Sequence, residues 1–318
     1  VVNYEDEYYI EAGISHTNGS TTAVTLPKTV SGGAMARIKE TDGTTGFYVF
    51  DTVRGANKFV YWGAGGNAAE DTSTWSDQNL TGTTLTLPSA LASGTFLIEI
   101  FYMGSYFQID TFEGTGADHL ETLPAALDSV AGMGWVKTRD SGSTGKLQHV
   151  GLGGTHYLDT FSTAVAVDSS DFWNDVAASA TQYTVGTDDA VNKDGDNYIA
   201  YWWANSGPYK FGVIEGNGNA DGSMANVGGL PASVMAKSID STSSWYVGNI
   251  KNNPDNPADQ NMVLNTTGVI FTEADWDILS TGFKFRIATD PNVAETYVYG
   301  AFGIQPLTNG AINQSRAR

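Results

Sequence analysis

The sequence predicts an all-β fold of three tandem antiparallel β-sandwich repeats, jelly-roll-like, with very little helix. Short runs rich in Val, Ile, Thr, Tyr, Phe and Trp are bounded by Gly, Asn, Asp, Pro and Ser clusters, which is typical of antiparallel strands. Helical periodicity is almost absent. Several markers recur with a period of about one hundred residues, which indicates one structural unit used three times.

Three markers follow one another in the same order in each unit. These are a Leu-Pro pair, then the pattern Lys-x-x-Asp, then a Trp with a nearby Asp. The Leu-Pro pairs are Leu26-Pro27, Leu123-Pro124 and Leu230-Pro231. The Lys-x-x-Asp pairs are Lys39 and Asp42, Lys137 and Asp140, and Lys237 and Asp240. The tryptophan motifs are Trp75-Ser-Asp77, Trp173-Asn-Asp175 and Trp276-Asp277.

Each unit also begins and ends on an aromatic strand. The opening runs are Tyr8–Ile10, Tyr106–Ile109 and Tyr209–Phe211, and the closing runs are Phe96–Tyr102, Tyr198–Trp203 and Tyr297–Phe302. Gly104-Ser105-Tyr106 and Gly207-Pro208-Tyr209 join the units almost without a linker, so we expect the units to abut stiffly. The predicted domains are residues 1–104, 105–206 and 207–318.

Turns and helices follow from local chemistry. Asn-Gly and Asp-Gly pairs tolerate positive φ and predict hairpin turns at Asp42-Gly43, Asp194-Gly195, Asn217-Gly218 and Asp221-Gly222. The best candidates for short helical turns are Pro88–Ala92, Leu123–Leu127 and Thr272–Leu279, the last with Thr272 as N-cap.

The composition excludes several functions. Lys and Arg number 16 against 35 Asp and Glu, and the net charge of −19 would repel nucleic acid and anionic membranes. The chain has no cysteine, so neither disulfides nor thiolate metal sites can form. Its apolar runs are too short to span a bilayer. Because the chain begins at Val1 without a signal peptide, we expect a processed product, a fragment or part of something longer.

Most candidate functional residues have a simpler structural interpretation. Trp75, Trp173 and Trp276 could stack on sugars, but a large aromatic recurring at one place in each unit favours core packing. Lys-x-x-Asp could mediate interactions, although it more simply marks a strand end that enters a turn. The acidic segment 188–196 carries enough oxygens to suggest calcium, but it lacks the Glu that completes an EF-hand loop.

No catalytic, cofactor-binding or metal-ligating residue is assigned, and we expect no cofactor and no enzymatic activity. The glycine-rich pieces at 63–66 and 151–154 lack the Lys-Ser/Thr of a phosphate loop. The four histidines form neither a triad pattern nor an HExxH motif. Paired carboxylates for glycoside cleavage stay open, because distances are invisible in a sequence. The histidines are His16, His119, His149 and His156.

At Asp51–Gly55, Gly132–Lys137 and Tyr198–Tyr201, among other segments, the sequence resembles a family of repeated all-β domains in virion structural proteins of aquatic tailed bacteriophages. Asp51-Thr-Val-Arg54-Gly55 is similar to its D-x-x-R-G segment, and Gly132–Lys137 to its P-x-W-V-hydrophobic-K segment. The family's Trp before Val is Ser233 in the third unit, and the Arg of D-x-x-R-G is not evident in the second. Further similar segments are Phe172–Asp175, Tyr183–Gly186, Asn192 with Gly195, Tyr198–Tyr201, Lys210–Gly212, Gly216–Gly218, Asp221-Gly222, Leu230–Met235, Ser280–Phe285, Thr296–Tyr299, Pro306 and Ser315–Arg318.

The resemblance implies a virion location and a structural role, and it supplies no catalytic residue. The first hypothesis is an elongated tail-fibre or adhesin-like protein with a possible host-surface-binding role, because stiff serial β-modules can project a binding surface. The alternatives are a capsid decoration or head-fibre protein, and a carbohydrate-binding or depolymerising module. The expected partners are other virion proteins, further copies of the chain (a trimer by analogy with fibres) and possibly a host surface glycan. Nucleic acid and membrane insertion are not expected.

Overall fold

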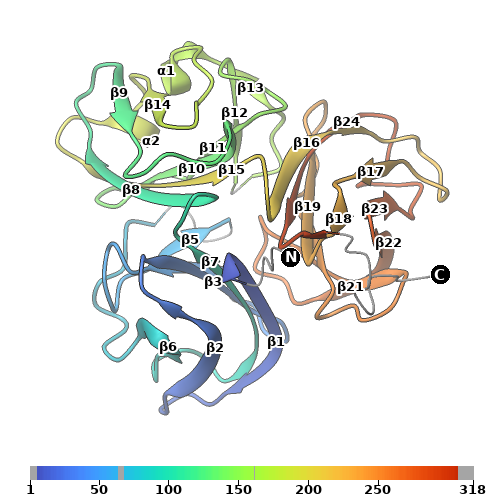
Figure 1. Ribbon diagram of the computed structural model, residues 1–318, viewed down its shortest axis with the longest axis horizontal. Helices are drawn as coiled ribbons and strands as arrows, with labels where there is room; N and C mark the ends of the chain where they lie inside the picture. The colour runs from blue at the N-terminus through green and yellow to red at the C-terminus, as the bar shows by residue number, and fades with distance from the viewer. Residues whose placement is uncertain (1–5, 64–67, 161, 307–318) are drawn as a thin grey trace.

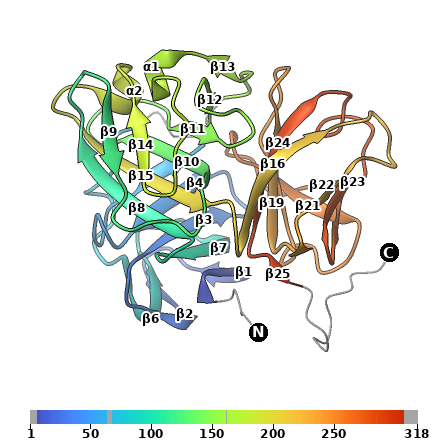
Figure 2. The ribbon, with the colours of Figure 1, turned by 45° about the horizontal axis from the view of Figure 1, so that its top comes forward.

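A computed structural model describes residues 6–63, 68–160 and 162–306 of the chain (Figure 1). It consists almost entirely of antiparallel β structure, which confirms the all-β prediction. Its strands form three lobes arranged around a common centre, as both views show (Figures 1 and 2). The start of the chain, residues 64–66 of the first glycine-rich piece and the terminal segment 315–318 lie outside the described residues.

The first unit has one larger sheet of strand order β1-β7-β3-β4-β5 and a smaller pair formed by β2 and β6. Its strands are β1 (Tyr8–His16), β2 (Thr22–Val30), β3 (Ala34–Glu40), β4 (Phe47–Asp51), β5 (Val60–Trp62), β6 (Asn79–Leu87) and β7 (Gly94–Tyr102).

The second unit has a sheet of order β13-β12-β11-β10-β15-β8 and a smaller pair formed by β9 and β14. Its elements are β8 (Phe107–Glu113), β9 (His119–Thr122), β10 (Ala131–Thr138), β11 (Lys146–His149), β12 (His156–Asp159), β13 (Val167–Asp168), α1 (Ser170–Trp173), β14 (Gln182–Val185), α2 (Asp189–Asn192) and β15 (Asn197–Ala204).

In the third unit one sheet runs β16-β24-β19-β20-β21-β22-β23-β17 and curves towards a barrel, beside the short pair β18 and β25. Its strands are β16 (Tyr209–Glu215), β17 (Met224–Asn226), β18 (Gly229–Leu230), β19 (Ser233–Ser238), β20 (Tyr246–Asn249), β21 (Ala258–Val263), β22 (Phe271–Leu279), β23 (Gly282–Phe285), β24 (Thr296–Phe302) and β25 (Gln305–Pro306).

The same strand order occurs in all three units. The first strand pairs with the last, the last pairs with the strand that carries the Lys of Lys-x-x-Asp, and the next two strands follow in order. The register agrees as well, because Lys39, Lys137 and Lys237 lie opposite Leu97, Ile199 and Val298, respectively. In each unit, the strand that follows the opening strand also pairs with the strand that precedes the closing strand. These pairs are β2-β6, β9-β14 and β17-β23.

The closing strands β7, β15 and β24 are buried on both faces. In β15, Tyr198, Ala200 and Trp202 face the core of the second unit, whereas Tyr201 and Trp203 belong to a central cluster shared by all three units. A strand covered on both sides must be apolar at nearly every position, because neither face meets water. This explains why the closing runs lack the alternation of polar and apolar residues that a strand with one wet face would show.

The central cluster is built around aromatic rings from equivalent register positions. Phe101, Trp203 and Phe302 of the three closing strands lie opposite Tyr8, Phe107 and Tyr209 of the three opening strands. The ring centroids of Phe101 and Trp203 are 5.6 Å apart, those of Phe101 and Phe302 5.8 Å, and those of Trp203 and Phe302 6.4 Å. The three units therefore pack face to face around one aromatic centre with approximate threefold arrangement.

Several sequence expectations differ from the structure. Leu123–Leu127 forms no helical turn, and of the four predicted hairpin turns only Asp42-Gly43 joins two paired strands, β3 and β4. Thr272–Leu279 does not form a helix but lies in β22, because pairing with β21 and β23 on both sides outweighs a local helical pattern. The units also do not follow one another end to end as an elongated protein requires, because their larger sheets face a shared core. The single-turn helices α1 and α2, with Ser169 and Asp188 as their N-caps, lie at positions where no helix was predicted.

Candidate functional site

The three repeated tryptophans lie in the interior cores of their units. Trp75, Trp173 and Trp276 are 3%, 0% and 0% exposed, so none of them can serve as a platform for a sugar. Each packs in the core of its own unit, away from the central cluster. Trp276 also donates a hydrogen bond from Nε1 to Oδ1 of Asn261 at 3.1 Å.

The lysines of Lys-x-x-Asp are fully buried and point their amino groups at backbone carbonyls. Lys39 Nζ donates to Thr45 O and Lys137 Nζ to Ser143 O, both at 2.6 Å, while Lys237 Nζ donates to Ser238 O at 2.6 Å. Burial lowers the pKa of each lysine to about 8, because desolvation disfavours the charged ammonium. Lys39 and Lys137 thus fasten the turns that follow their strands, and Lys237 bonds the end of its own strand and also lies 3.5 Å from Ser241 O in the turn.

The aspartates of the same motif have one common role at the start of the closing strand. Asp42 accepts a hydrogen bond from Thr95 N at 2.7 Å, Asp140 from Asn197 N at 2.6 Å, and Asp240 from Thr296 N at 2.7 Å. Each of the three donors lies one residue before the first residue of its closing strand that pairs with the lysine strand. The motif therefore marks a strand end that enters a turn, as expected.

The acidic segment 188–196 is organised by hydrogen bonds to the protein. Asp188 caps α2 by accepting from Ala190 N at 2.8 Å, and Asp196 pairs with Lys193 at 3.2 Å. Buried Asn192 accepts from Thr115 N at 2.8 Å and donates to Ala117 O at 2.7 Å, which holds the loop after β8. Within the described ranges, no group of three or more His, Cys, Asp or Glu side chains is placed to hold a metal ion.

The four histidines have separate partners. His16 contacts Thr22, His119 pairs with Glu121, and His156 contacts Thr155. His149 is buried; its Nδ1 accepts from Gly151 N and its Nε2 donates to Tyr299 O, both at 3.0 Å. Burial lowers the pKa of His149 to about 4, because the charged imidazolium is desolvated there. His149 is therefore a neutral side chain that joins the second unit to the third.

The D-x-x-R-G segment lies at the contact between the first and second units. Arg54 is fully buried, and its Nε donates to Asp51 Oδ2 at 2.6 Å while its Nη1 pairs with Glu70 Oε2 at 3.0 Å. Tyr201 of β15 donates to Asp51 Oδ2 at 2.7 Å and lies 3.0 Å from Arg54 Nη2. Glu70 also pairs with Arg139 of the second unit at 2.9 Å. Sequence reasoning recognised the segment but could not predict that its partners come from another unit.

One buried carboxyl has strongly altered acidity. Asp275 is fully buried in the third unit, where desolvation raises its pKa to about 8, and its Oδ2 accepts from Asn261 Nδ2 at 3.1 Å. A general acid must reach its substrate. A side chain with no exposed surface does not meet that requirement in this conformation.

Three pockets lie at corresponding places in the three units. Each adjoins the start of the strand with the buried lysine and the end of the following strand, that is β3 and β4, β10 and β11, or β19 and β20. Their cavity volumes are about 170 Å³ in the second unit, 510 Å³ in the first and 200 Å³ in the third. The pocket of the first unit is lined with polar groups such as Ser31, Gln78 and Asn79, and that of the third also with Tyr8–Ile10 of β1.

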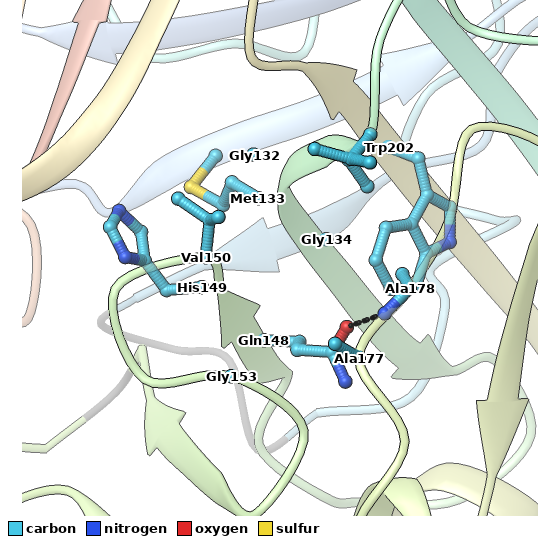
Figure 3. A pocket seen from close by; sticks show the side chains of 12 residues that line it. Gly132, Met133, Gly134, Gln148, His149, Val150, Gly153, Ala177, Ala178 and Trp202 are labelled. Carbon is cyan, nitrogen blue, oxygen red and sulfur yellow. Dashed lines mark hydrogen bonds between the residues drawn. The ribbon is translucent and has the colours of Figure 1, made fainter.

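The pocket of the second unit is apolar (Figure 3). Met133, Val150, Ala178 and Trp202 contribute to its walls together with Gly132, Gly134 and Gly153, and of these glycines Gly153 has open space beside its Cα. Its two polar side chains are already engaged. Gln148 Oε1 accepts from Ala178 N at 2.9 Å, shown as a dashed line, and both nitrogens of His149 have the partners given above. The pocket therefore offers mainly apolar contact, and among its lining side chains the indole Nε1 of Trp202, which is buried, has no hydrogen-bond partner.

No helix in the described part of the chain is both long enough and apolar enough to cross a membrane.

Comparisons with known proteins give a family and a weak likeness to a solved structure. No curated protein sequence matches the chain. A solved chain described as "Crystal Structure of the STIV MCP" matches with a TM-score of 0.22 and 11% identity, covering 62% of this chain and 96% of that one. A likeness of this size carries no argument about fold or function.

The family described as "Domain of unknown function (DUF7483)" matches residues 103–306. The match begins in the connection between the first and second units, ends with β25 and includes both later units together. Because it covers more than half of the 318 residues, the chain belongs to the DUF7483 family.

Proposed function

We propose that this chain is a non-enzymatic structural protein of a bacteriophage virion, in which three copies of one β-sandwich domain form a compact block. The observation that carries the proposal is the common strand order and register of the three units around one core. Repeating one unit with the same fastening residues is typical of a scaffold. Catalysis, in contrast, needs one specialised constellation of groups.

The repeated residues support a scaffold because each of them stabilises its own unit. The buried tryptophans fill cores, the lysines and aspartates fasten turns, and Asp51, Arg54 and Tyr201 join two units. None of the described aromatic side chains is exposed, which weakens the alternative of a carbohydrate-binding module that stacks sugars on aromatic rings.

The compact shape favours capsid decoration or a head position over a rod-like tail fibre. A fibre gains length when its modules stack in series, whereas here the larger sheets of three units face one centre (Figure 1). A block with approximate threefold arrangement presents three comparable sides to its neighbours. This suits a protein placed among other virion proteins on a shell.

Quantitative mass spectrometry of purified particles, combined with a cryo-electron microscopy map, tests the proposal. We expect the chain in purified particles at hundreds of copies, located on the shell. A handful of copies at the tail would favour the tail-fibre alternative. Absence from particles, or release of reducing ends from host polysaccharide by the purified protein, would contradict the structural role.

A further inference from the structure

Four exposed valines gather around the apolar pocket of the second unit. We call them the valine patch, and they are Val130, Val150, Val176 and Val213, which are 55%, 39%, 43% and 48% exposed. Val130 and Val150 line the pocket, and Val176 precedes Ala177, which also lines it. Half of the large hydrophobic side chains that are exposed in the described structure thus lie at one place. Concentrated exposed apolar surface of this kind marks an interaction site in soluble proteins.

Direct contacts make the valine patch continuous with the contact between the second and third units. Val213 on β16 lies over Gly151, where an added Cβ would come within 2.5 Å of Val213 Cγ1. Phe211, two residues earlier, covers Gly132 in the same way at 2.2 Å. His149 joins Tyr299 O beneath this surface. The patch is therefore an outward extension of an apolar interface that the molecule already contains.

We propose that the valine patch is a docking site for another protein of the particle, which inserts one apolar side chain such as Leu, Met or Phe into the pocket. The volume of about 170 Å³ is close to that of cavities that hold a single benzene-sized group. Gln148 and His149 are already engaged, and the remaining lining side chains are apolar apart from the buried indole N–H of Trp202. The occupant is thus apolar and about the size of one large side chain.

The valines outside the pocket indicate why the occupant belongs to a protein. A small molecule would fill the cavity and leave Val176 and Val213 exposed to water. A protein surface would cover the four valines while its anchor residue fills the cavity, which is the usual arrangement of an interface hot spot. The corresponding pocket of the first unit, lined by Ser31, Gln78 and Asn79, lacks this apolar character and provides an internal control.

The absence of cysteine from the sequence allows the pocket to be probed by disulfide trapping. Ala177→Cys places a thiol at the rim of the apolar pocket, and Ala56→Cys places one at the rim of the polar pocket. Each variant is equilibrated with the symmetric disulfide of 2-phenylethanethiol, 3-methylbutanethiol or 3-mercaptopropanamide in a fixed excess of 2-mercaptoethanol, so that the protein thiolate attacks the disulfide and releases one free thiol. The mixed disulfides are then measured by intact-protein mass spectrometry.

With Ala177→Cys we expect about tenfold or greater preference for the two apolar thiols over the amide, because only they gain from leaving water. Ala56→Cys should show a much smaller preference. Adding Ala178→Phe to Ala177→Cys fills the cavity and should abolish the preference, with circular dichroism confirming that the variant is folded. Equal capture of all thiols by Ala177→Cys, or undiminished preference in the filled variant, would overturn the proposal.

A second experiment tests the partner and rests on the proposed virion function. Particles carrying Ala177→Cys or Ala56→Cys are treated with a maleimide, and labelling rates are compared with those of the free protein. We expect labelling of Ala177→Cys to slow at least tenfold in the particle, with little change for Ala56→Cys. Unchanged labelling of Ala177→Cys within particles overturns the docking proposal. Absence of the chain from particles instead contradicts the proposed function and the particle partner, and the trapping result then decides whether the pocket accepts apolar groups.

Discussion

At the residue scale, the buried lysines Lys39, Lys137 and Lys237 show how one motif stabilises the same turn three times. On folding, each ammonium loses its water and donates instead to one or two carbonyl oxygens. These bonds use part of its hydrogen-bonding capacity, but they do not replace the solvation of its charge. Desolvation therefore lowers the pKa of each lysine from 10.5 to about 8. The cost of this buried charge has a measurable pH dependence.

We expect the free energy of unfolding to rise with pH between about pH 8 and 9.5. Below pH 8 both states hold the lysine protons and the folded state bears the full cost of burial. Above it the folded state releases its protons first, which favours folding by about 1 kcal/mol per lysine per pH unit. Urea denaturation across this range measures the slope. The triple variant with Met at these positions should lose most of it, and an equal slope in that variant would contradict the explanation.

Trp173 carries a second prediction at this scale. Its ring is fully buried in the core of the second unit, so Trp173→Ala leaves a large cavity. We expect a loss of about 3–5 kcal/mol in the free energy of unfolding. Val269→Ala, at an exposed position, is the matched control and should change stability by about 0.5 kcal/mol or less. Similar losses for both variants would show that the tryptophan is not a core residue.

Arg54 carries a third prediction. Removing its guanidinium leaves the buried carboxylate of Asp51 without a cationic partner, and Arg139 becomes the remaining ion-pair partner of Glu70. We expect Arg54→Ala to cost about 3–5 kcal/mol, because an unpaired buried charge is strongly unfavourable. Arg139→Ala removes a more exposed member of the same network and should cost much less. Chemical denaturation compares the two, and equal losses would be inconsistent with a buried charge at Asp51.

At the scale of elements, β10 and β15 depend on glycine to bring an aromatic ring against the backbone. The face of β10 towards Trp202 carries Gly134, and a Cβ built there would lie only 2.1 Å from Trp202 Cζ3. The next residue, Trp135, faces the opposite way and stacks on Trp62 of the first unit at 4.5 Å between ring centroids. One strand thus serves two cores through alternate positions.

Gly134→Ala tests this close approach. We expect a loss of about 1–3 kcal/mol, because the new methyl group forces Trp202 out of place. In the background of Trp202→Leu the same change should cost much less, since the clashing ring is gone. A double-mutant cycle measured by denaturation gives the coupling free energy. If the two effects simply add, the close contact does not limit stability.

At the scale of the whole molecule, the three units share a central core in addition to the core inside each unit. Rings from all three units meet at Phe101, Trp203 and Phe302, and an isolated unit would expose its share of this surface to water. We expect a single cooperative transition in calorimetry, with the calorimetric and van't Hoff enthalpies equal. Residues 105–206 expressed alone should aggregate or remain unfolded. A stable, soluble fragment or three separate transitions would contradict a shared core.

The sequence alone determined the all-β class, the positions of the opening and closing strands and the end of the lysine strand at Lys-x-x-Asp. These follow from local information, because β-rich runs and turn residues act within a few positions of one another. The same local reasoning failed at Thr272–Leu279, where hydrogen bonds to β21 and β23 decide the structure. The continuous apolar closing runs did contain a further signal, since such runs indicate burial on both faces.

Only the tertiary structure decided what covers those faces. The stacking of Trp62 on Trp135, the bond from Tyr201 to Asp51 and the gathering of the valine patch all join residues of different units. No sequence periodicity encodes such pairs, because their positions depend on how three sheets pack around one centre. The arrangement of the units and the candidate docking site therefore depend on packing between distant segments, whereas the strands depend on their own residues.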